Sequence, residues 1–289
     1  MSAATRFAPS PTGYLHLGHA YSALDAYRAA RETDGRFLLR IEDIDSGRCR
    51  PEYEAAIFED LAWLGLTWEE PVRRQSEHLA DYRALLDELR TAGLIYPCFC
   101  TRRDIRREIA RAAAAPHGPD GAIYPGTCRG LRTAERDRRA EAGEPHALRL
   151  DMARAAEKAG KLRWHDREQG EIVADPSVFG DVVLARKEIP TSYHLAVTLD
   201  DHVQGVSLVT RGEDLFAATH IHRLLQALLG LSTPEYAHHK LLRDTEGRRF
   251  AKRDRALTLH DLRAAGHTPE CLRQVLAKPD ELPAFLAIL

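Results

Sequence analysis

A short segment near the start of the chain constrains the fold most. An apolar, strand-like run over residues 5–8 is followed by a Pro-Ser-Pro-Thr-Gly turn and then by a helix that opens with His16-Leu-Gly-His19. A helix N-terminus presents unpaired N–H groups and a positive dipole end, and a glycine such as Gly18 lets a ligand lie against the backbone. Because His16 and His19 project from one side of the helix, the segment predicts a strand–turn–helix unit that binds a polyphosphate such as that of ATP.

Strands and helices alternate over the first hundred residues. Helices are expected over residues 19–34, about 51–64 and about 77–92, and a buried strand over residues 36–41. Helices of this length between strands favour a parallel, doubly wound sheet of the Rossmann-like α/β class. In such a sheet a ligand lies beyond the carboxyl ends of the strands, where the proline-rich turn and the acidic residues 42–45 both fall.

Residues 98–180 interrupt this alternation with three cysteines, a Pro- and Gly-rich loop and a hairpin expected over residues 162–174. We interpret this segment as an α+β subdomain inserted into the nucleotide-binding domain. The end of the chain is expected to form short helices, one of which begins at the N-cap and N1 pair Thr268-Pro269. The expected division is a catalytic domain of residues 1–97 and 181–242, an insertion of residues 98–180, and a basic loop with a helical tail of residues 243–289.

The overall composition limits the partners. The chain carries 41 Lys and Arg against 43 Asp and Glu, so any RNA contact depends on local basic patches rather than on a basic excess. Such patches occur over residues 102–107, 129–139 and 248–255, although a solvated helix face or loop is the ordinary alternative. The sequence has no run of 18 apolar residues and no secretory layout at its N-terminus, which predicts a cytoplasmic protein without a membrane span.

Several segments resemble one family of enzymes. The stretch FAPSPTGYLHLGHA, residues 7–20, is similar to the HIGH signature of class I aminoacyl-tRNA synthetases, and in particular to the glutamyl-tRNA synthetases. The segments LRIEDID, YHLAVTLDD and LVTRGEDL also resemble that family, and the resemblance covers about residues 5–255. It implies a class I synthetase fold, with a Rossmann-like parallel sheet, an inserted zinc-bearing subdomain and a short helical C-terminal segment. It also implies the activation of L-glutamate by Mg²⁺-bound ATP.

A basic segment late in the chain resembles the second signature of this class, Lys-Met-Ser-Lys-Ser. Here the segment reads Arg249-Phe-Ala-Lys-Arg253, and Lys252 stands where the family has its functional lysine. A lysine at this position can stabilise the charge that develops on the leaving pyrophosphate. The segment departs from the family pattern, because Arg249 replaces the first lysine and Ala251 replaces the serine, which removes a hydroxyl donor to phosphate.

A glutamate substrate presents two carboxylates, which arginine and hydroxyl groups bind best, and an ammonium, which needs a carboxylate. The resemblance implies the following glutamate-binding residues: Arg6, Ser10, Glu42, Tyr193 and Arg211. Three alternatives stay open. Arg211 could form a surface ion pair with Glu213 or Asp214, and Tyr193 could be a packed aromatic residue. Either Asp43 or Asp45 could bind the ammonium instead of Glu42, or cap the next helix.

Three of the five cysteines, Cys98, Cys100 and Cys128, have a spacing that suits a structural zinc site. The odd number of cysteines argues against a disulfide framework. The family resemblance points to Tyr124 as the fourth ligand of one zinc ion. A free phenol ionises only near pH 10, so the metal would have to stabilise the phenolate. His117 in the same loop is the conventional alternative, and three reduced thiols without metal are the other.

The resemblance to glutamyl-tRNA synthetases stops near residue 254, and the 36 residues from 254 to 289 are fewer than an independent domain needs. We therefore expect no helical anticodon-reading domain. The chain resembles the shortened paralogous family, the glutamyl-queuosine tRNA(Asp) synthetases, in which glutamate is activated by ATP and esterified onto queuosine in the anticodon loop of tRNA(Asp). We expect a monomer, and the implied partners are ATP, L-glutamate and the tRNA(Asp) anticodon stem-loop.

In this interpretation His16, His19 and Lys252 are the catalytic residues that stabilise the phosphate charge, and Gly18 belongs to the ATP site. Three other functions are compatible with the sequence. The chain could be a truncated glutamyl-tRNA synthetase that charges a tRNA 3′ end. It could be a catalytically silent paralogue that binds glutamate or RNA. It could also be a class I nucleotidyl transferase that activates another small acid.

Overall fold

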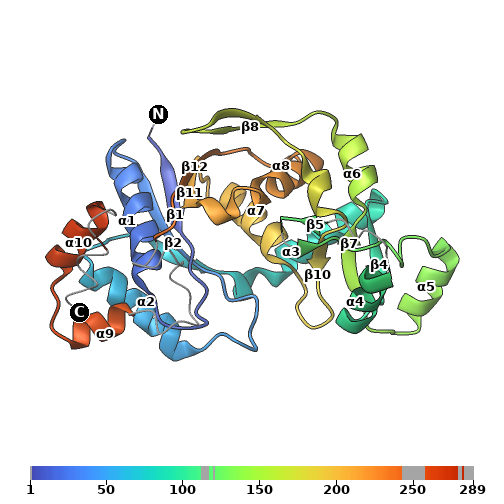
Figure 1. Ribbon diagram of the computed structural model, residues 1–289, viewed down its shortest axis with the longest axis horizontal. Helices are drawn as coiled ribbons and strands as arrows, with labels where there is room; N and C mark the ends of the chain where they lie inside the picture. The colour runs from blue at the N-terminus through green and yellow to red at the C-terminus, as the bar shows by residue number, and fades with distance from the viewer. Residues whose placement is uncertain (1, 112–116, 120, 243–257, 279–281, 283–289) are drawn as a thin grey trace.

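The computed structural model describes residues 2–111, 117–119, 121–242, 258–278 and 282, and Figure 1 shows its elements along the chain. The expected Rossmann-like parallel sheet is present. Its first part consists of three parallel strands in the order β1-β2-β3, namely β1 (Ala4–Phe7), β2 (Arg36–Ile41) and β3 (Glu69–Arg74). The helices α1 (Leu17–Arg31) and α2 (Pro51–Trp63) connect them, close to the predicted ranges.

Strand β3 is not among the predicted strands, because its sequence Glu-Glu-Pro-Val-Arg-Arg is polar and largely exposed. It lies at the edge of the three-stranded sheet, where a proline that cannot donate to the ladder is tolerated. Two short 3₁₀ turns accompany these units, η1 (Gln75–His78) after β3 and η3 (Glu213–Leu215) later in the chain.

The second part of the sheet is built mainly from the later half of the chain. Its strand order is β11-β12-β8-β9, namely β11 (Leu208–Gly212), β12 (Glu235–His239), β8 (Arg163–Asp166) and β9 (Gly170–Val173). The two parts lie side by side, and Ser207 N–H donates to the carbonyl of Ala4 at 3.0 Å. The predicted hairpin is confirmed as β8–β9, and β8 runs parallel to β12. The helices α7 (Tyr193–Val203) and α8 (Ala218–Leu229) belong to this part.

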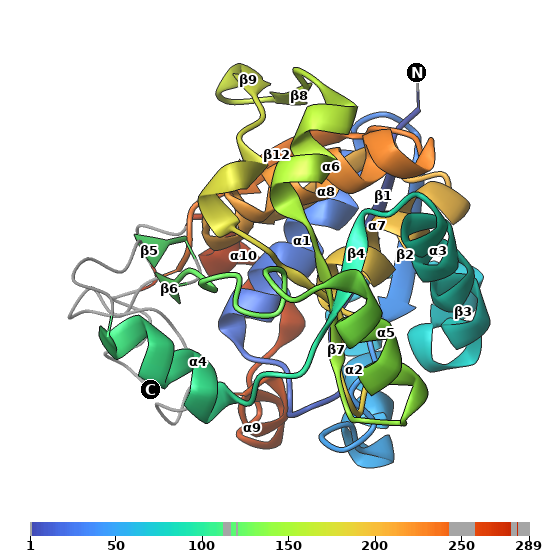
Figure 2. The ribbon, with the colours of Figure 1, turned by 90° about the vertical axis from the view of Figure 1, so that its right-hand side faces the viewer.

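A separate antiparallel sheet has the order β10-β7-β4, namely β10 (Val183–Ala185), β7 (Ala147–Leu150) and β4 (Ile95–Cys98). Around it lie α3 (Leu79–Thr91), α4 (Arg102–Arg111), α5 (Thr133–Glu141), α6 (Met152–Ala159), the turn η2 (Pro176–Phe179) and the short pair β5 (His117–Gly118) and β6 (Gly121–Ala122). Figure 2 shows α4 and α5 in the lower half of the view and the β8–β9 hairpin at the top. The limits of the insertion stay a prediction.

The helix α1 packs against the sheet through small residues. Ala20, Ala23, Ala26 and Ala30 are all buried, so the helix backbone can approach the strands closely. The tail helices α9 (Leu259–Ala264) and α10 (Pro269–Ala277) complete the same core. The predicted cap at Thr268 is confirmed, since its hydroxyl accepts from Cys271 N–H at 3.3 Å. In the part of the chain that the structure describes, no helix has the length and apolar character that crossing a bilayer requires.

Candidate active site

A cavity of about 600 Å³ lies at the carboxyl ends of β1, β2 and β11. The predicted site residues that line it are Arg6, Ser10, His16, Gly18, His19, Glu42, Tyr193 and Arg211. The structure therefore brings together residues that are spread over more than two thirds of the sequence. Lys252 lies outside the described residues. The roles of all these residues stay predictions.

The N-terminus of α1 is capped by His16 and His19. The Nδ1 atom of His16 accepts from Gly18 N–H at 3.1 Å, and the Nδ1 atom of His19 accepts from His16 N–H at 3.2 Å. Because each Nδ1 acts as an acceptor, both neutral rings carry their proton on Nε2, which makes Nε2–H the donor of each ring. A Cβ at position 18 would lie 3.0 Å from the His16 ring, so a larger residue would require this ring to shift by a few tenths of an ångström. The backbone N–H of Gly18, which a helix start would otherwise leave unpaired, is thus hydrogen-bonded to His16 within the turn.

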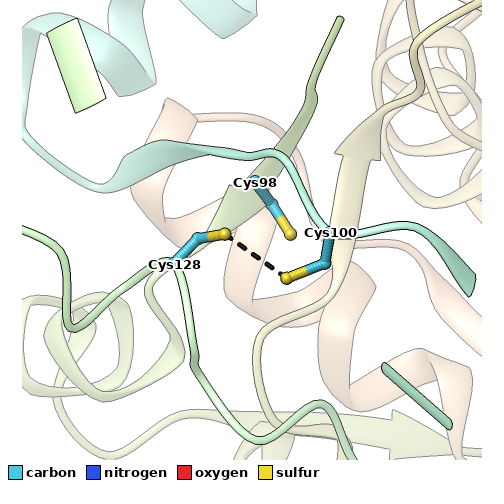
Figure 3. A group of neighbouring side chains, drawn as sticks. All are labelled: Cys98, Cys100 and Cys128. Atoms are coloured by element: carbon cyan, nitrogen blue, oxygen red, sulfur yellow. Dashed lines mark hydrogen bonds between the residues drawn. The ribbon is translucent and has the colours of Figure 1, made fainter. Parts of the chain in front are cut away.

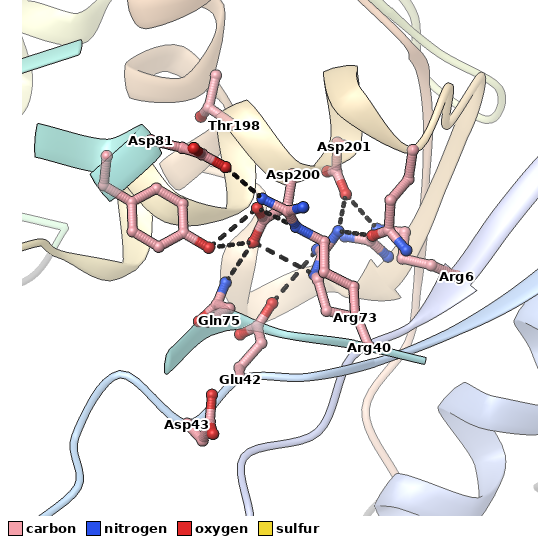
Figure 4. A network of polar contacts seen from close by, with 12 residues as sticks. Arg6, Arg40, Glu42, Asp43, Arg73, Gln75, Asp81, Thr198, Asp200 and Asp201 are labelled. Atoms are coloured by element: carbon pink, nitrogen blue, oxygen red, sulfur yellow. Dashed lines mark hydrogen bonds and ion pairs between the residues drawn. The ribbon is translucent and has the colours of Figure 1, made fainter. Parts of the chain in front are cut away.

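On the side away from the cavity, Arg6 belongs to a buried network of ion pairs and hydrogen bonds, which Figure 4 shows. Its Nε donates to Asp201 at 3.0 Å and one terminal nitrogen donates to the Thr210 carbonyl at 3.1 Å. Arg40, which is fully buried, donates to the same Asp201 oxygen at 2.8 Å and to Glu42 at 3.3 Å. Although burial raises it, Arg6 and Arg40 hold the pKa of Asp201 below its ordinary value. Arg6 therefore reaches the cavity as a fixed cation.

The three acids after β2 have different surroundings. Asp43 accepts from the N–H and the hydroxyl of Ser76, and Asp45 pairs with Arg48 at 2.6 Å. Glu42 is buried at the cavity wall, and burial raises its pKa to about 7 against the opposing effect of Arg40 and Arg6. Glu42 and Asp45 both line the cavity, and only Glu42 is buried; the ammonium-binding role of Glu42 stays a prediction.

Arg211 does not form the surface ion pair with Glu213 or Asp214 that the sequence leaves open. It is buried, and its guanidinium donates to Thr219, His222 and His238. Tyr193 begins α7 beside the cavity with its ring edge-on to two histidine rings, and burial raises its pKa. Ser10 is exposed at the rim of the cavity.

The predicted metal ligands also lie together, as Figure 3 shows for the cysteines. The sulfur atoms of Cys98, Cys100 and Cys128 are all within 4.8 Å of one another. The phenol oxygen of Tyr124 lies 3.4 Å from the sulfur of Cys98 and 3.5 Å from that of Cys100. Four donors at this spacing fit a tetrahedral zinc site. The side chain of His117, the alternative ligand, lies outside what the structure describes.

Two groups of residues near the cavity are not found by sequence reasoning. The first is Arg40 with Asp200 and Asp201, and the second is the set of imidazoles around Arg211. The adjacent aspartates stand in the segment YHLAVTLDD, and two neighbouring acids in an otherwise apolar segment are a usable signal. Arg40 and His238 offered no such signal, because the aspartates that they contact lie 161 and 72 positions away in the sequence.

Comparison with known proteins agrees with this geometry. The model of the family "tRNA synthetases class I (E and Q), catalytic domain" matches residues 2–279. The chain therefore belongs to the class I tRNA synthetases of the glutamate and glutamine type, and it is an aminoacyl-tRNA ligase. The predicted resemblance to the shortened paralogues is confirmed by relatives named Glutamyl-Q tRNA(Asp) synthetase. The relative from Rhodobacter capsulatus is 51% identical over 94% of this chain and 99% of its own length. The relative from Nocardia farcinica is 47% identical over 95% of this chain and 82% of its own length.

Longer relatives and solved structures share the same catalytic part. The Glutamate–tRNA ligase of Aquifex aeolicus is 37% identical over 93% of this chain and 55% of its own length. The crystal structure of a glutamate tRNA ligase from Elizabethkingia meningosepticum in complex with its amino acid has a TM-score of 0.79 and 27% identity. It covers 96% of this chain, which spans 61% of that structure.

Proposed function

We propose that this protein activates L-glutamate with ATP and transfers the glutamyl group to queuosine in the anticodon loop of tRNA(Asp). The main support is one cavity at the strand ends that combines a two-histidine helix start with two buried arginines and a buried acid. The relatives named Glutamyl-Q tRNA(Asp) synthetase support the choice of acceptor.

The activation step forms one bond and breaks another. An oxygen of the glutamate α-carboxylate attacks the α-phosphorus of ATP, and the bond to pyrophosphate breaks. His16 and His19, each with an Nε2–H donor, stabilise the phosphate oxygens, and Lys252 is proposed to follow the leaving group. Arg6 and Arg211 bind the carboxylates, Glu42 binds the ammonium, and the phenol of Tyr193 and the hydroxyl of Ser10 orient the substrate. Mg²⁺ bound with ATP would supply further charge compensation.

The transfer step consumes the mixed anhydride. A hydroxyl of the queuosine base attacks the activated carbonyl carbon, and AMP leaves. Since this acceptor belongs to an anticodon loop, the catalytic part itself would bind the stem-loop. The zinc site of Cys98, Cys100, Cys128 and Tyr124 has a structural role in this proposal, holding β4 to the loop that follows it.

The alternative is transfer to a tRNA 3′ end, which the Glutamate–tRNA ligase relatives favour. Incubation with labelled glutamate, ATP and total tRNA, followed by mapping of the labelled nucleotide, separates the two. We expect label on queuosine of tRNA(Asp) and none on an unmodified tRNA(Asp) transcript of the same sequence. Label on the 3′ adenosine of tRNA(Glu) would favour the alternative. Failure of glutamate to support ATP–pyrophosphate exchange would contradict both.

A further inference from the structure

Arg211 differs from the other buried arginines of the site in the nature of its partners. It is 6% exposed and lines the cavity, yet no carboxylate of the described residues lies within 4.0 Å of its guanidinium. Its Nε–H donates to His238 Nε2 at 3.1 Å, and its terminal nitrogens donate to His222 Nδ1 at 3.2 Å and to Thr219 Oγ1 at 2.5 Å. A buried charge that is hydrogen-bonded only to neutral groups remains uncompensated.

The first acceptor, His238, is fixed in its tautomer by an aspartate. The Nδ1 atom of His238 lies 2.7 Å from Asp166 Oδ2, and a carboxylate can only accept, so the proton of the ring is on Nδ1. This leaves Nε2 unprotonated and able to accept from Arg211. Asp166 is itself fixed, because its other oxygen accepts from the N–H groups of Glu168 and Gln169, both at 3.0 Å, in the turn between β8 and β9.

The second acceptor, His222, lies between Arg211 and another histidine, His194. Since its Nδ1 accepts from Arg211, its proton is on Nε2, which lies 3.1 Å from His194 Nδ1. Burial lowers the pKa of His238 to about 4 and that of His194 to about 4, with Arg211 acting in the same direction. Burial also lowers the pKa of His222 well below its ordinary value. Near pH 7 His238 and His222 are therefore neutral acceptors beside the guanidinium, and His194 is a neutral acceptor for His222.

We infer that Asp166 and His238 are positioning residues that aim the guanidinium of Arg211 at a carboxylate of glutamate. This inference rests on the proposed glutamate activation. Of the five N–H donors of an arginine, three are bound by the groups named above, and one on each terminal nitrogen remains for a bidentate carboxylate. Because the groups that touch Arg211 are neutral, and the carboxylate of Asp166 lies behind the His238 ring, a substrate carboxylate would be the first anion in direct contact with the guanidinium. The hairpin β8–β9 supplies the aspartate that fixes this arrangement.

Asp166→Asn tests the inference with little change of shape. The introduced asparagine can still accept from the two backbone N–H groups, but its amide would donate to His238 Nδ1. The His238 ring would then carry its proton on Nε2, so that two N–H donors would face each other and the hydrogen bond from Arg211 Nε would be lost. We expect the KM for glutamate in ATP–pyrophosphate exchange to rise about 10- to 100-fold, the effect of losing one hydrogen bond to a charged group, with the KM for ATP unchanged. Glu171→Gln on the same hairpin, which only removes the exposed ion pair with Arg163, is the matched control and should leave both KM values unchanged.

A second pair of variants separates positioning from a merely structural role. In His238→Gln the side-chain carbonyl can accept from Arg211 without help from Asp166, whereas His238→Leu offers no acceptor. We expect the KM for glutamate to be at least about tenfold higher in the leucine variant, and Asp166→Asn to add little in the glutamine background. Equal KM values for the two, or an unchanged KM in Asp166→Asn, would overturn the inference. Absence of glutamate-dependent exchange in the wild type would instead overturn the proposed function.

Discussion

Removal of Arg40 should destabilise the protein strongly, because its side chain balances the charges behind the cavity. Arg6, Arg40 and Arg73 face Glu42, Asp200 and Asp201, three cations against three anions, and Arg40 and Asp200 have fully buried side chains. Breaking a buried ion pair by removing one partner costs about 3–5 kcal/mol. For a chain of this size that corresponds to a fall in Tm of about 6–10 °C for Arg40→Met.

The expected loss also depends on pH. In the wild type the pKa of Glu42 is about 7, above its unfolded value of 4.5, and without Arg40 it should rise further. From about pH 8 upward the wild-type Glu42 is ionised in both the folded and the unfolded state, so its contribution to stability no longer changes with pH. The variant retains the proton in the folded state and loses stability as pH rises. Because wild-type Glu42 is still half protonated at pH 7 and loses its remaining proton by pH 8, the gap should widen by about 1 kcal/mol between pH 7 and pH 8.

Thermal unfolding followed by circular dichroism at pH 6, 7 and 8 measures both effects. Arg163→Met is the matched control, because Arg163 forms an exposed pair with Glu171 and such pairs contribute little. Adding Glu42→Gln to Arg40→Met restores the balance of charge and should recover part of the loss and remove the pH dependence. If Arg40→Met lowers the Tm by less than about 2 °C, the proposed stabilising role of the buried charge network is wrong.

Three further predictions concern the metal, the pH profile and the basic loop. Purified protein should contain about one zinc per chain, and Cys128→Ser should lose most of it; metal analysis that finds none in the wild type contradicts the assignment. The kcat/KM for glutamate should fall as pH drops below about 7, because protonated Glu42 cannot balance an ammonium, and Glu42→Gln should abolish this step in the pH profile. Lys252→Ala should lower the rate of ATP–pyrophosphate exchange about 100-fold or more at unchanged Tm, and an unaltered rate would rule out the leaving-group role.

The sequence predicted features that depend on neighbouring residues. The helix start at His16 to His19, the cysteine spacing and the hairpin that contains Asp166 are all encoded within short stretches, where turn, cap and period follow from local chemistry. The parallel sheet followed from the alternation of strands and helices. The resemblance to a family then assigned Arg6, Tyr193 and Arg211 to one pocket before any contact was visible.

The partners of these residues could not be predicted, because they depend on tertiary contacts. Arg40 and Asp201 are 161 positions apart, and Asp166 and His238 are 72 positions apart. Nothing in the local pattern around His238 distinguishes a histidine that accepts from an arginine from an ordinary core histidine. The polar edge strand β3 was missed for a similar reason, since its pairing with β2 is not visible in its composition.

The packing of α9 and α10 against α1 and α2 has a consequence for how the protein acquires its structure during synthesis. Arg263 pairs with Glu59 across 204 positions, and Arg273 donates to the Leu64 carbonyl across 209 positions. Leu259 and Leu272 fill the same core as Ile57 and Leu61. The apolar faces of α1 and α2, which leave the ribosome early, therefore stay partly uncovered until α9 and α10 have been synthesised. We expect nascent chains that end before residue 258 to need a chaperone to stay unaggregated.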